Sequence, residues 1–202
     1  MARTIDPAKH EARRLVIIDA ALTCFAATGY AGTSTAAICQ RAGIGSGTFF
    51  HYFPTKQSLL LAILAYGTDE TRAWFADRAD EDDPLAVVEA YLAHTAEEFS
   101  DPRMAGFVRA VSAVMGEAEV EAALALDARV LQEGLEPWVA RAQASGQMRT
   151  DLTAHDLTTW VLVVLDGFLG RLVVDEDFTA ERQVGALLDV VRRVLAPPLS
   201  GA

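Results

Sequence analysis

Cysteine is scarce in this chain of 202 residues, which contains only Cys24 and Cys39. Two cysteines are too few for a disulfide framework, and neither has a second Cys or a His at the spacing typical of metal ligands. The sequence therefore predicts a protein of the reducing cytoplasm that has no metal site and needs no disulfide.

Motifs that carry catalysis are also missing. The chain has no Gly-rich phosphate loop, no His-Glu-x-x-His and no Gly-x-Ser-x-Gly sequence. Its histidines are scattered along the chain at His10, His51, His94 and His155. We therefore expect neither an enzyme nor a bound cofactor.

Long hydrophobic runs are few. The N-terminus begins with charged and polar residues rather than with the pattern of a signal peptide. The apolar stretch 157–165 is followed by Asp166 and Arg171, which interrupt it before the roughly 20 residues that cross a bilayer. The sequence thus predicts no leader peptide and no membrane partner.

Positive charge is in short supply, and it is unevenly distributed. The net charge is -11, yet residues 1–56 carry a net charge of +3 and the remainder carries -14. The overall charge argues against a protein that coats nucleic acid along its whole surface. The split indicates an anionic partner that contacts one end only.

Strand-like alternation is absent beyond a few residues, whereas helical spacing recurs throughout. We therefore predict an all-α fold of about nine helices. Gly134 and Pro137 lie inside one of them and predict a kink or a division there. The expected ranges are about 9–28, 35–43, 45–53, 55–80, 84–99, 103–115, 118–144, 154–174 and 179–195.

The second and third of these helices form a helix-turn-helix pattern. Small residues in the segment 37–45 allow two short helices to cross closely, and glycines supply the turn between them. Such a pair projects its second helix, which can enter the DNA major groove, about 12 Å wide. The same pattern can also arise from packing of short helices without DNA.

The polar side chains of this region suit contacts with a duplex. We expect Thr33, Tyr52 and Lys56 to position phosphates, with Ser34 at a helix start that favours anions. Base readout is assigned to Ser46, Thr48 and Phe49. His51 lies on the same segment, and Arg3, Lys9, Arg13 and Arg14 are expected to form a flexible basic arm. The candidate DNA-binding residues are Thr33, Ser34, Ser46, Thr48, Phe49, His51, Tyr52 and Lys56.

Residues of roughly 13–62 resemble the DNA-binding domain of TetR-type transcriptional repressors without a gap. The resemblance rests on Phe25–Tyr30, Thr33–Thr35, Ala42–Ile44, Gly47–Phe49 and His51–Pro54, together with Ile38 and Lys56. It implies a three-helix DNA-binding head, an all-helical regulatory body, a homodimer, and release from an operator when a small molecule binds. The expected domains are 1–56, with the basic arm, and 57–202.

Three positions depart from the family pattern. Gly45 stands where the family usually has Ser, Phe50 where it has Tyr, and Thr35 where it has an aliphatic residue. The missing hydroxyl of Phe50 removes an expected phosphate contact. Gly45 is a weaker helix cap than Ser by a few tenths of a kcal/mol. Neither change destroys the motif.

The last two helices are apolar on more than one face. Leu157, Val161 and Phe168 form one apolar face of the helix expected at 154–174, and this face must pack against other residues. Leu162 and Leu169 belong to a second apolar face. We predict that residues 154–195 form a two-fold, four-helix interface with a second chain. A symmetric dimer implies a palindromic operator of double-stranded DNA.

Aromatic and sulfur-containing residues of the body are candidates for an effector site, although each is also a plausible core residue. They predict a small apolar or aromatic effector. Tyr91 and His94 share one helix face and offer polar tips. The candidate ligand-binding residues are Trp74, Tyr91, His94, Phe107, Met115, Trp138, Trp160 and Phe168. The alternative is a regulator that responds to no ligand, or to redox state or a metal through Cys24 and Cys39.

Overall fold

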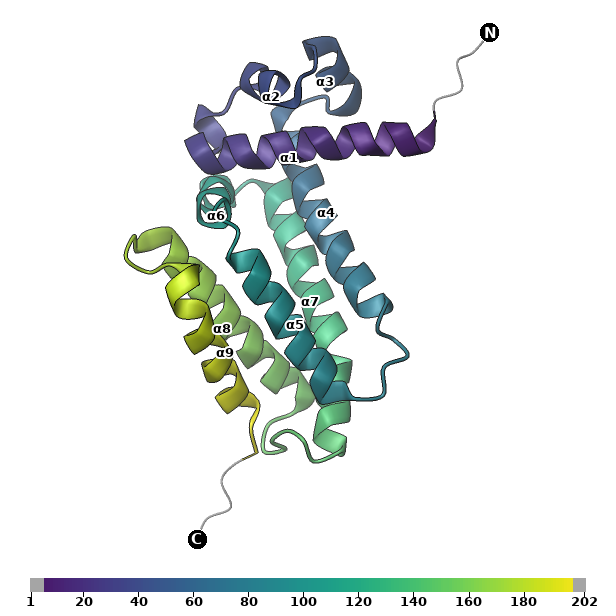
Figure 1. Ribbon diagram of the computed structural model, residues 1–202, viewed down its shortest axis with the longest axis vertical. Helices are drawn as coiled ribbons and strands as arrows, with labels where there is room; N and C mark the ends of the chain where they lie inside the picture. The colour runs from purple at the N-terminus through teal and green to yellow at the C-terminus, as the bar shows by residue number, and fades with distance from the viewer. Residues whose placement is uncertain (1–5, 198–202) are drawn as a thin grey trace. The chain divides into compact units, whose positions relative to one another are not determined.

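The computed structural model describes residues 6–197, which form nine α-helices and no strand (Figure 1). This confirms the expected all-α class. The helices are α1 Pro7–Gly32, α2 Thr35–Ala42, α3 Ser46–Tyr52, α4 Lys56–Ala76, α5 Pro84–Phe99, α6 Met104–Ser112, α7 Ala118–Ala144, α8 Ala154–Val174 and α9 Ala180–Leu195.

The chain divides into two compact units. The N-terminal unit comprises the chain up to Tyr66 together with Gly106–Leu124, and the C-terminal unit comprises Gly67–Ala105 and the chain from Ala125 onward. These units differ from the expected division at residue 56, because the start of α4 and most of α6 pack into the N-terminal core. The functional assignment of 1–56 and 57–202 stays a prediction.

The core of the N-terminal unit is built on α1. Ile17, Phe25, Ile38 and Phe49 are fully buried there, and α2 and α3 lie against α1 (Figure 1). α6 approaches α1 so closely that a Cβ on Gly106 would lie 2.2 Å from the Ala26 carbonyl oxygen. Only a glycine fits at that crossing.

α1 begins earlier than expected. The Asp6 side chain caps its N-terminus by accepting a hydrogen bond from the Ala8 amide at 3.1 Å, and Pro7 fits the first turn. Lys9, Arg13 and Arg14 therefore lie on a helix, and their assignment to a flexible arm is wrong; Arg3 falls outside the described residues. Gly29, at φ 70°, breaks the helix where a stop was expected.

The C-terminal unit packs α5, α8 and α9 around a second core that includes Leu135, Leu157 and Val161 (Figure 1). α7 is one helix that contains Pro137, so the alternative of two helices is wrong. Gly134 is required for packing, because a Cβ there would lie 2.3 Å from Cδ2 of Phe75.

Two helices, α1 and α8, are long and apolar enough to cross a membrane by length and composition. The exclusion argued from Asp166 and Arg171 was therefore too strict. Composition alone carries little weight here, because a core helix of a soluble protein meets the same criterion.

Candidate nucleic-acid interface

The turn between α2 and α3 is set by Gly43. This residue adopts φ 63° and ψ 39°, the left-handed conformation that glycine tolerates, and the Ile44 amide donates to the Cys39 carbonyl at 3.0 Å. Gly45 then begins α3 without a side-chain cap. The structure thus contains the two short helices and the glycine turn of the expected helix-turn-helix.

α3 has one buried and one exposed face. Phe49 and Phe53 lie in the core, whereas Ser46, Thr48 and His51 are exposed. The fully buried Phe49 cannot reach a base edge, so its assignment to readout is wrong. Its side chain instead fixes α3 against the N-terminal core.

Phe50 was noted in the sequence only for its missing hydroxyl, and it was not among the candidate DNA-binding residues. Half of its surface is accessible (51%), and its ring contacts Phe49 edge-on at 5.2 Å between ring centres. Phe50 follows Ser46 by one helical turn, which places both on the same face. That spacing was the signal that could have identified it.

Thr33 is buried, and it does not present its hydroxyl to solvent. Oγ1 lies 2.7 Å from the Gly29 carbonyl oxygen, 3.0 Å from the Cys24 carbonyl oxygen and 2.8 Å from Oγ1 of Thr28. These contacts hold the end of α1, where Gly29 interrupts the helix. The expected phosphate contact of the Thr33 side chain is therefore wrong, because its hydroxyl is used internally.

Ser34 is exposed and caps α2. Its Oγ accepts a hydrogen bond from the Ala37 amide at 3.1 Å. The cap orients the first turn of α2, whose remaining amides carry the partial positive charge that attracts anions. Ser34 stays a candidate for positioning the phosphate backbone.

Lys56 connects α4 with the end of α1. Its Nζ donates to the Tyr30 carbonyl at 2.6 Å and to the Thr33 carbonyl at 2.9 Å, and it lies 4.3 Å from the centre of the Tyr30 ring. An ammonium has three donors, and these two bonds use two of them. Lys56 therefore holds the fold together in addition to any contact with DNA.

Tyr30 completes this junction. Its ring packs on Phe25 with ring centres 5.5 Å apart. Burial raises the pKa of the phenol, and the nearby Glu117 carboxylate raises it further. Both effects reinforce the neutral form that a phenol already has at physiological pH, so the hydroxyl remains a hydrogen-bond donor.

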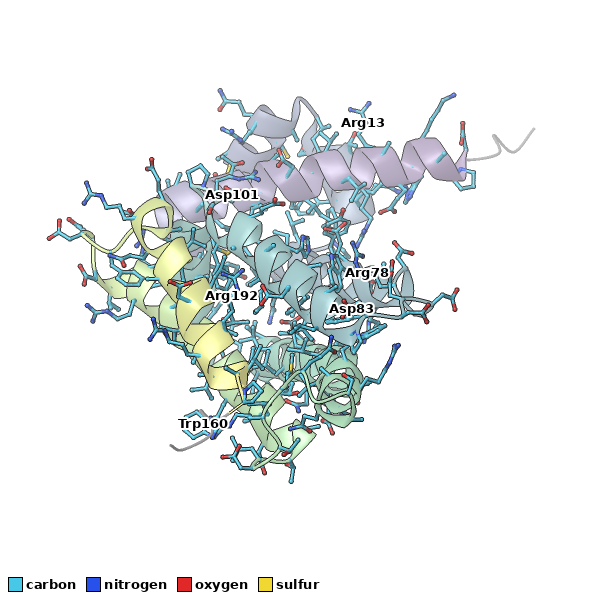
Figure 2. The ribbon with its side chains drawn as sticks, turned by 60° about the horizontal axis from the view of Figure 1, so that its bottom comes forward. Arg13, Arg78, Asp83, Asp101, Trp160 and Arg192 are labelled. Carbon is cyan, nitrogen blue, oxygen red and sulfur yellow. The ribbon has the colours of Figure 1, made fainter. Side chains whose placement is uncertain are left out.

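The basic residues of the N-terminal unit differ in availability. Lys9 pairs with Asp6 at 3.4 Å and Arg14 pairs with Glu11 at 3.0 Å, whereas Arg13 and Arg41 are exposed and make no ion pair within residues 6–197. Arg13 stands on α1 and is labelled in Figure 2. Arg41, on the last turn of α2, was not singled out by the sequence and joins Arg13 as a candidate phosphate contact.

A small ring cluster lies between α1 and α3. The His10 ring packs on Tyr52 at 4.5 Å between centres and lies 6.1 Å from the His51 ring. Tyr52 is half-buried by these contacts, while His51 stays exposed. The cluster ties α3 to the first turns of α1.

The predicted effector residues fall into separate regions. Trp74, Tyr91 and His94 contact one another, with Trp74 stacked on His94 at 5.9 Å and edge-on to Tyr91 at 5.4 Å. Trp138 and Phe168 belong to the same C-terminal core. The structure thus brings these five residues into one unit.

The other three predicted effector residues do not join this group. Phe107 packs against the N-terminal core, and Met115 lies exposed in that unit. Trp160 is also exposed, at 55% (Figure 2). Helical spacing could not reveal which face of each helix turns outward, and the effector role of these three residues stays a prediction.

The exposed side of α8 is apolar. Trp160, Val163 and Val174 are largely accessible, and the intervening Gly167 and Gly170 have open space where a Cβ would be. These positions recur every three or four residues and so share one face. Such a face is suited to close packing with another helix.

The cysteines belong to the N-terminal unit. Cys39 is buried and Cys24 half-buried, and both are free thiols. Burial raises the pKa of the Cys24 thiol, although Arg41 opposes this effect. Since the thiolate is the reactive form, the raised pKa disfavours a redox response. Among residues 6–197 no three His, Cys, Asp or Glu side chains could hold a metal ion.

Comparison with known proteins identifies the family. Residues 17–63 match the model described as bacterial regulatory proteins, tetR family. The HTH-type transcriptional repressor AcnR of Corynebacterium glutamicum is 30% identical over 163 residues, which cover 79% of this chain and 81% of that protein. The chain belongs to the TetR family.

Other similarities agree with this TetR-family assignment. An HTH-type transcriptional regulator of Bacillus subtilis, YuxN, is 45% identical over 56 residues, covering 28% of this chain and 19% of its own. A TetR transcription regulator from Haloarcula marismortui has the same fold, with a TM-score of 0.79 and 18% identity over 92% of this chain and 97% of that one. TetR-family proteins are DNA-binding transcriptional regulators rather than enzymes.

Proposed function

We propose that this TetR-family chain represses transcription as a homodimer on a palindromic operator and leaves it when a small effector binds the C-terminal unit. The observation that carries the DNA contact is the division of α3 into a buried face, which anchors it, and an exposed face. Ser46, Thr48 and His51 would face the duplex, together with Phe50. A regulator that binds operator DNA would act in the cytoplasm.

The apolar face of α8 supports dimerisation. Trp160 and Val163 on α8 and Val190 on α9 are exposed apolar side chains. Exposure of such a surface to water is unfavourable, and apolar patches of this kind mark interaction sites. A two-fold pairing through residues 154–195 would bury this surface against its own copy. It would also present two α3 helices about 34–36 Å apart, one turn of duplex.

Effector release is the third part of the proposal. Trp74, Tyr91 and His94 form a contiguous aromatic group within the C-terminal unit, and Trp138 and Phe168 lie in the same core. An effector acts only if it binds the DNA-free arrangement more tightly than the DNA-bound one. The group is suited to apolar or aromatic effectors.

Selection of bound fragments from random duplexes tests the DNA contact. We expect enrichment of a palindromic sequence, and Thr48→Ala should change preference at particular base pairs of each half-site. Enrichment no greater than that given by an unrelated acidic protein would overturn the proposed function.

Sedimentation velocity tests the dimer. Wild type is expected to sediment as a dimer, and Trp160→Glu should shift it to monomer because a charge would replace the largest exposed apolar side chain of α8. Glu176→Gln, in the α8–α9 loop, is the control. A wild-type monomer at all concentrations would refute the pairing.

A further inference from the structure

Acidic and hydroxyl side chains converge in the C-terminal unit beside the aromatic group. We define the acidic cluster as Tyr91, Thr95, Glu98, Asp127 and Asp166, drawn from α5, α7 and α8. Tyr91, Thr95 and Glu98 follow one another at helical spacing on one face of α5. Asp127 accepts a hydrogen bond from Oγ1 of Thr68 at 2.7 Å.

The carboxylates act on one another electrostatically. Burial raises the pKa of Glu98, and Glu70 and Asp127 raise it further, while His94 opposes the shift. Burial followed by Asp127 likewise raises the pKa of Asp166. The negative charges of Glu98, Asp127 and Asp166 are thus close enough to raise the pKa of neighbouring groups.

Tyr91 marks where these charges converge. Its pKa is raised first by burial, against the effect of Thr95, and Glu98, Asp127 and Asp166 each add to the rise. Carboxylates from three helices therefore act on one phenol. Because the rings of Trp74 and Phe75 lie on this phenol as well, the cluster adjoins an aromatic surface.

Thr95 supplies an independent sign of a missing partner. Only 5% of the surface of Thr95 is exposed, and its Oγ1 makes no hydrogen bond within the described part of the chain. The hydroxyl is near enough to the Tyr91 hydroxyl to affect its pKa, but no hydrogen bond of ordinary geometry joins them. An unpaired buried hydroxyl costs free energy, and a ligand that satisfied it would remove that cost.

Glu98 forms the solvent-exposed edge of the cluster. The Glu98 side chain keeps 51% of its surface exposed, and its Oε1 lies 3.8 Å from Nε2 of His94, beyond a good hydrogen bond. No three carboxylates among residues 6–197 approach closely enough to hold a metal ion. The negative charges are spread over a region larger than a metal site, beside rings that can cover an organic group.

From this arrangement we propose that the acidic cluster binds an organic cation, an amine or ammonium compound with an aromatic or apolar part. The carboxylates of Glu98, Asp127 and Asp166 would attract the charge, and Thr95 would hydrogen-bond to the ligand. Trp74 and Tyr91 would contact its apolar part, and their ring faces would also attract its positive charge. This inference rests on the proposed effector site and narrows its chemistry from apolar to cationic compounds.

Calorimetric titration of the full-length protein without DNA tests the charge preference. The probes are 2-phenylethylammonium, the neutral 2-phenylethanol and the anion phenylacetate, with magnesium chloride as a fourth. We expect the ammonium to bind at least about tenfold more tightly than the alcohol, a difference of about 1.4 kcal/mol. Equal or tighter binding of the alcohol or phenylacetate, binding of magnesium alone, or no binding of the ammonium at millimolar concentration would overturn the proposal.

Variants locate the site. Glu98→Gln and Asp127→Asn keep size and hydrogen-bonding capacity, and each should weaken ammonium binding about tenfold. Thr95→Val should weaken it less. The matched control is Glu97→Gln, whose parent side chain is exposed on the neighbouring position of α5. Equal affinity of wild type and both cluster variants would place the cation elsewhere and refute the assignment.

A gel shift with the selected operator separates this inference from the proposed function. Operator binding that only neutral compounds reverse would preserve the regulator and refute the cationic site. Binding of the ammonium without any effect on operator affinity would preserve the cationic site and refute effector release.

Discussion

The two units use their polar side chains in opposite ways. In the N-terminal unit, hydroxyls and cations that suit DNA are partly committed to the fold, as Thr33 and Lys56 are to the carbonyls at the end of α1. In the C-terminal unit, the buried Thr95 hydroxyl has no hydrogen-bond partner among the described residues, and the pKa of the Glu98 carboxyl is raised by burial and by neighbouring carboxylates. Residue type alone therefore does not show which polar side chains the fold itself uses.

The largest expected effect separates the two faces of α3. Phe49→Ala should lower the free energy of unfolding by about 3–5 kcal/mol, because it removes a fully buried ring. Phe50→Ala, one residue further and half exposed, should change stability by less than about 1 kcal/mol but weaken operator binding. Urea denaturation and gel shifts measure both, and similar stability losses for the two variants would contradict the assigned faces.

A second comparison concerns close packing in the C-terminal unit. Gly134→Ala should destabilise it by about 1–3 kcal/mol, since the new methyl group would overlap the Phe75 ring. Gly185→Ala, on α9 with open space around it, is the control and should stabilise by up to about 1 kcal/mol through helix propensity. Thermal denaturation distinguishes them, and a stabilising Gly134→Ala would show that Phe75 is free to move.

Helix positions followed closely from the sequence, because their signals are local. The range 84–99 was predicted from Pro84 and the acidic break before it, and the structure confirms it with an Asp83 cap. The start of α1 was missed although Asp6 and Pro7 carry the same kind of signal. The basic side chains after Pro7 suggested an arm, but the Asp6 cap favours a helix at these positions.

Side-chain roles were predicted less well, because they depend on contacts between distant segments. The hydrogen bonds of Lys56 join residues 23 and 26 positions apart, which no helical period reveals. Phe49 and Phe50 are adjacent and chemically identical, yet only their position on α3 decides which is buried. The acidic cluster combines residues of three helices and was invisible to spacing along the chain.

A third prediction contrasts two cations of the N-terminal unit. Lys56→Ala should lower stability by about 1–3 kcal/mol, because it leaves two carbonyls without their charged donor, and should also weaken operator binding. Arg13→Ala should leave stability within about 0.5 kcal/mol. Arg13→Ala should make the slope of the logarithm of the operator association constant against the logarithm of salt concentration shallower by about 0.9, the effect of one phosphate contact.

Denaturation and salt-dependent gel shifts test this third pair. An unchanged salt slope in Arg13→Ala would remove Arg13 from the interface. Full stability in Lys56→Ala would show that the carbonyls of Tyr30 and Thr33 find other donors, and the ammonium would then be free for DNA.

The smallest expected effect is a pH dependence in the C-terminal unit. The pKa of Glu98 is raised in the folded protein, by burial first and then by Glu70 and Asp127, against His94. The folded state therefore holds this proton more tightly than the unfolded state, so ionisation lowers stability as pH rises from the ordinary value near 4.3 through the raised one. Glu98→Gln cannot ionise, and it should melt at a higher temperature than wild type at neutral pH but at the same temperature below about pH 4.

Glu97→Gln is the control for this effect, because it removes one carboxylate charge from the neighbouring, exposed position of α5. The difference should be modest, since half of the Glu98 side chain remains in water. A bound organic cation should abolish it in wild type by favouring the ionised carboxylate, so that the ammonium probe stabilises wild type more at neutral pH than at acid pH. At neutral pH, Glu98→Gln could instead melt at a lower temperature than wild type. That result would mean that the carboxylate stabilises the unliganded fold. Its negative charge would then already be compensated within the protein, which contradicts the proposed cation site.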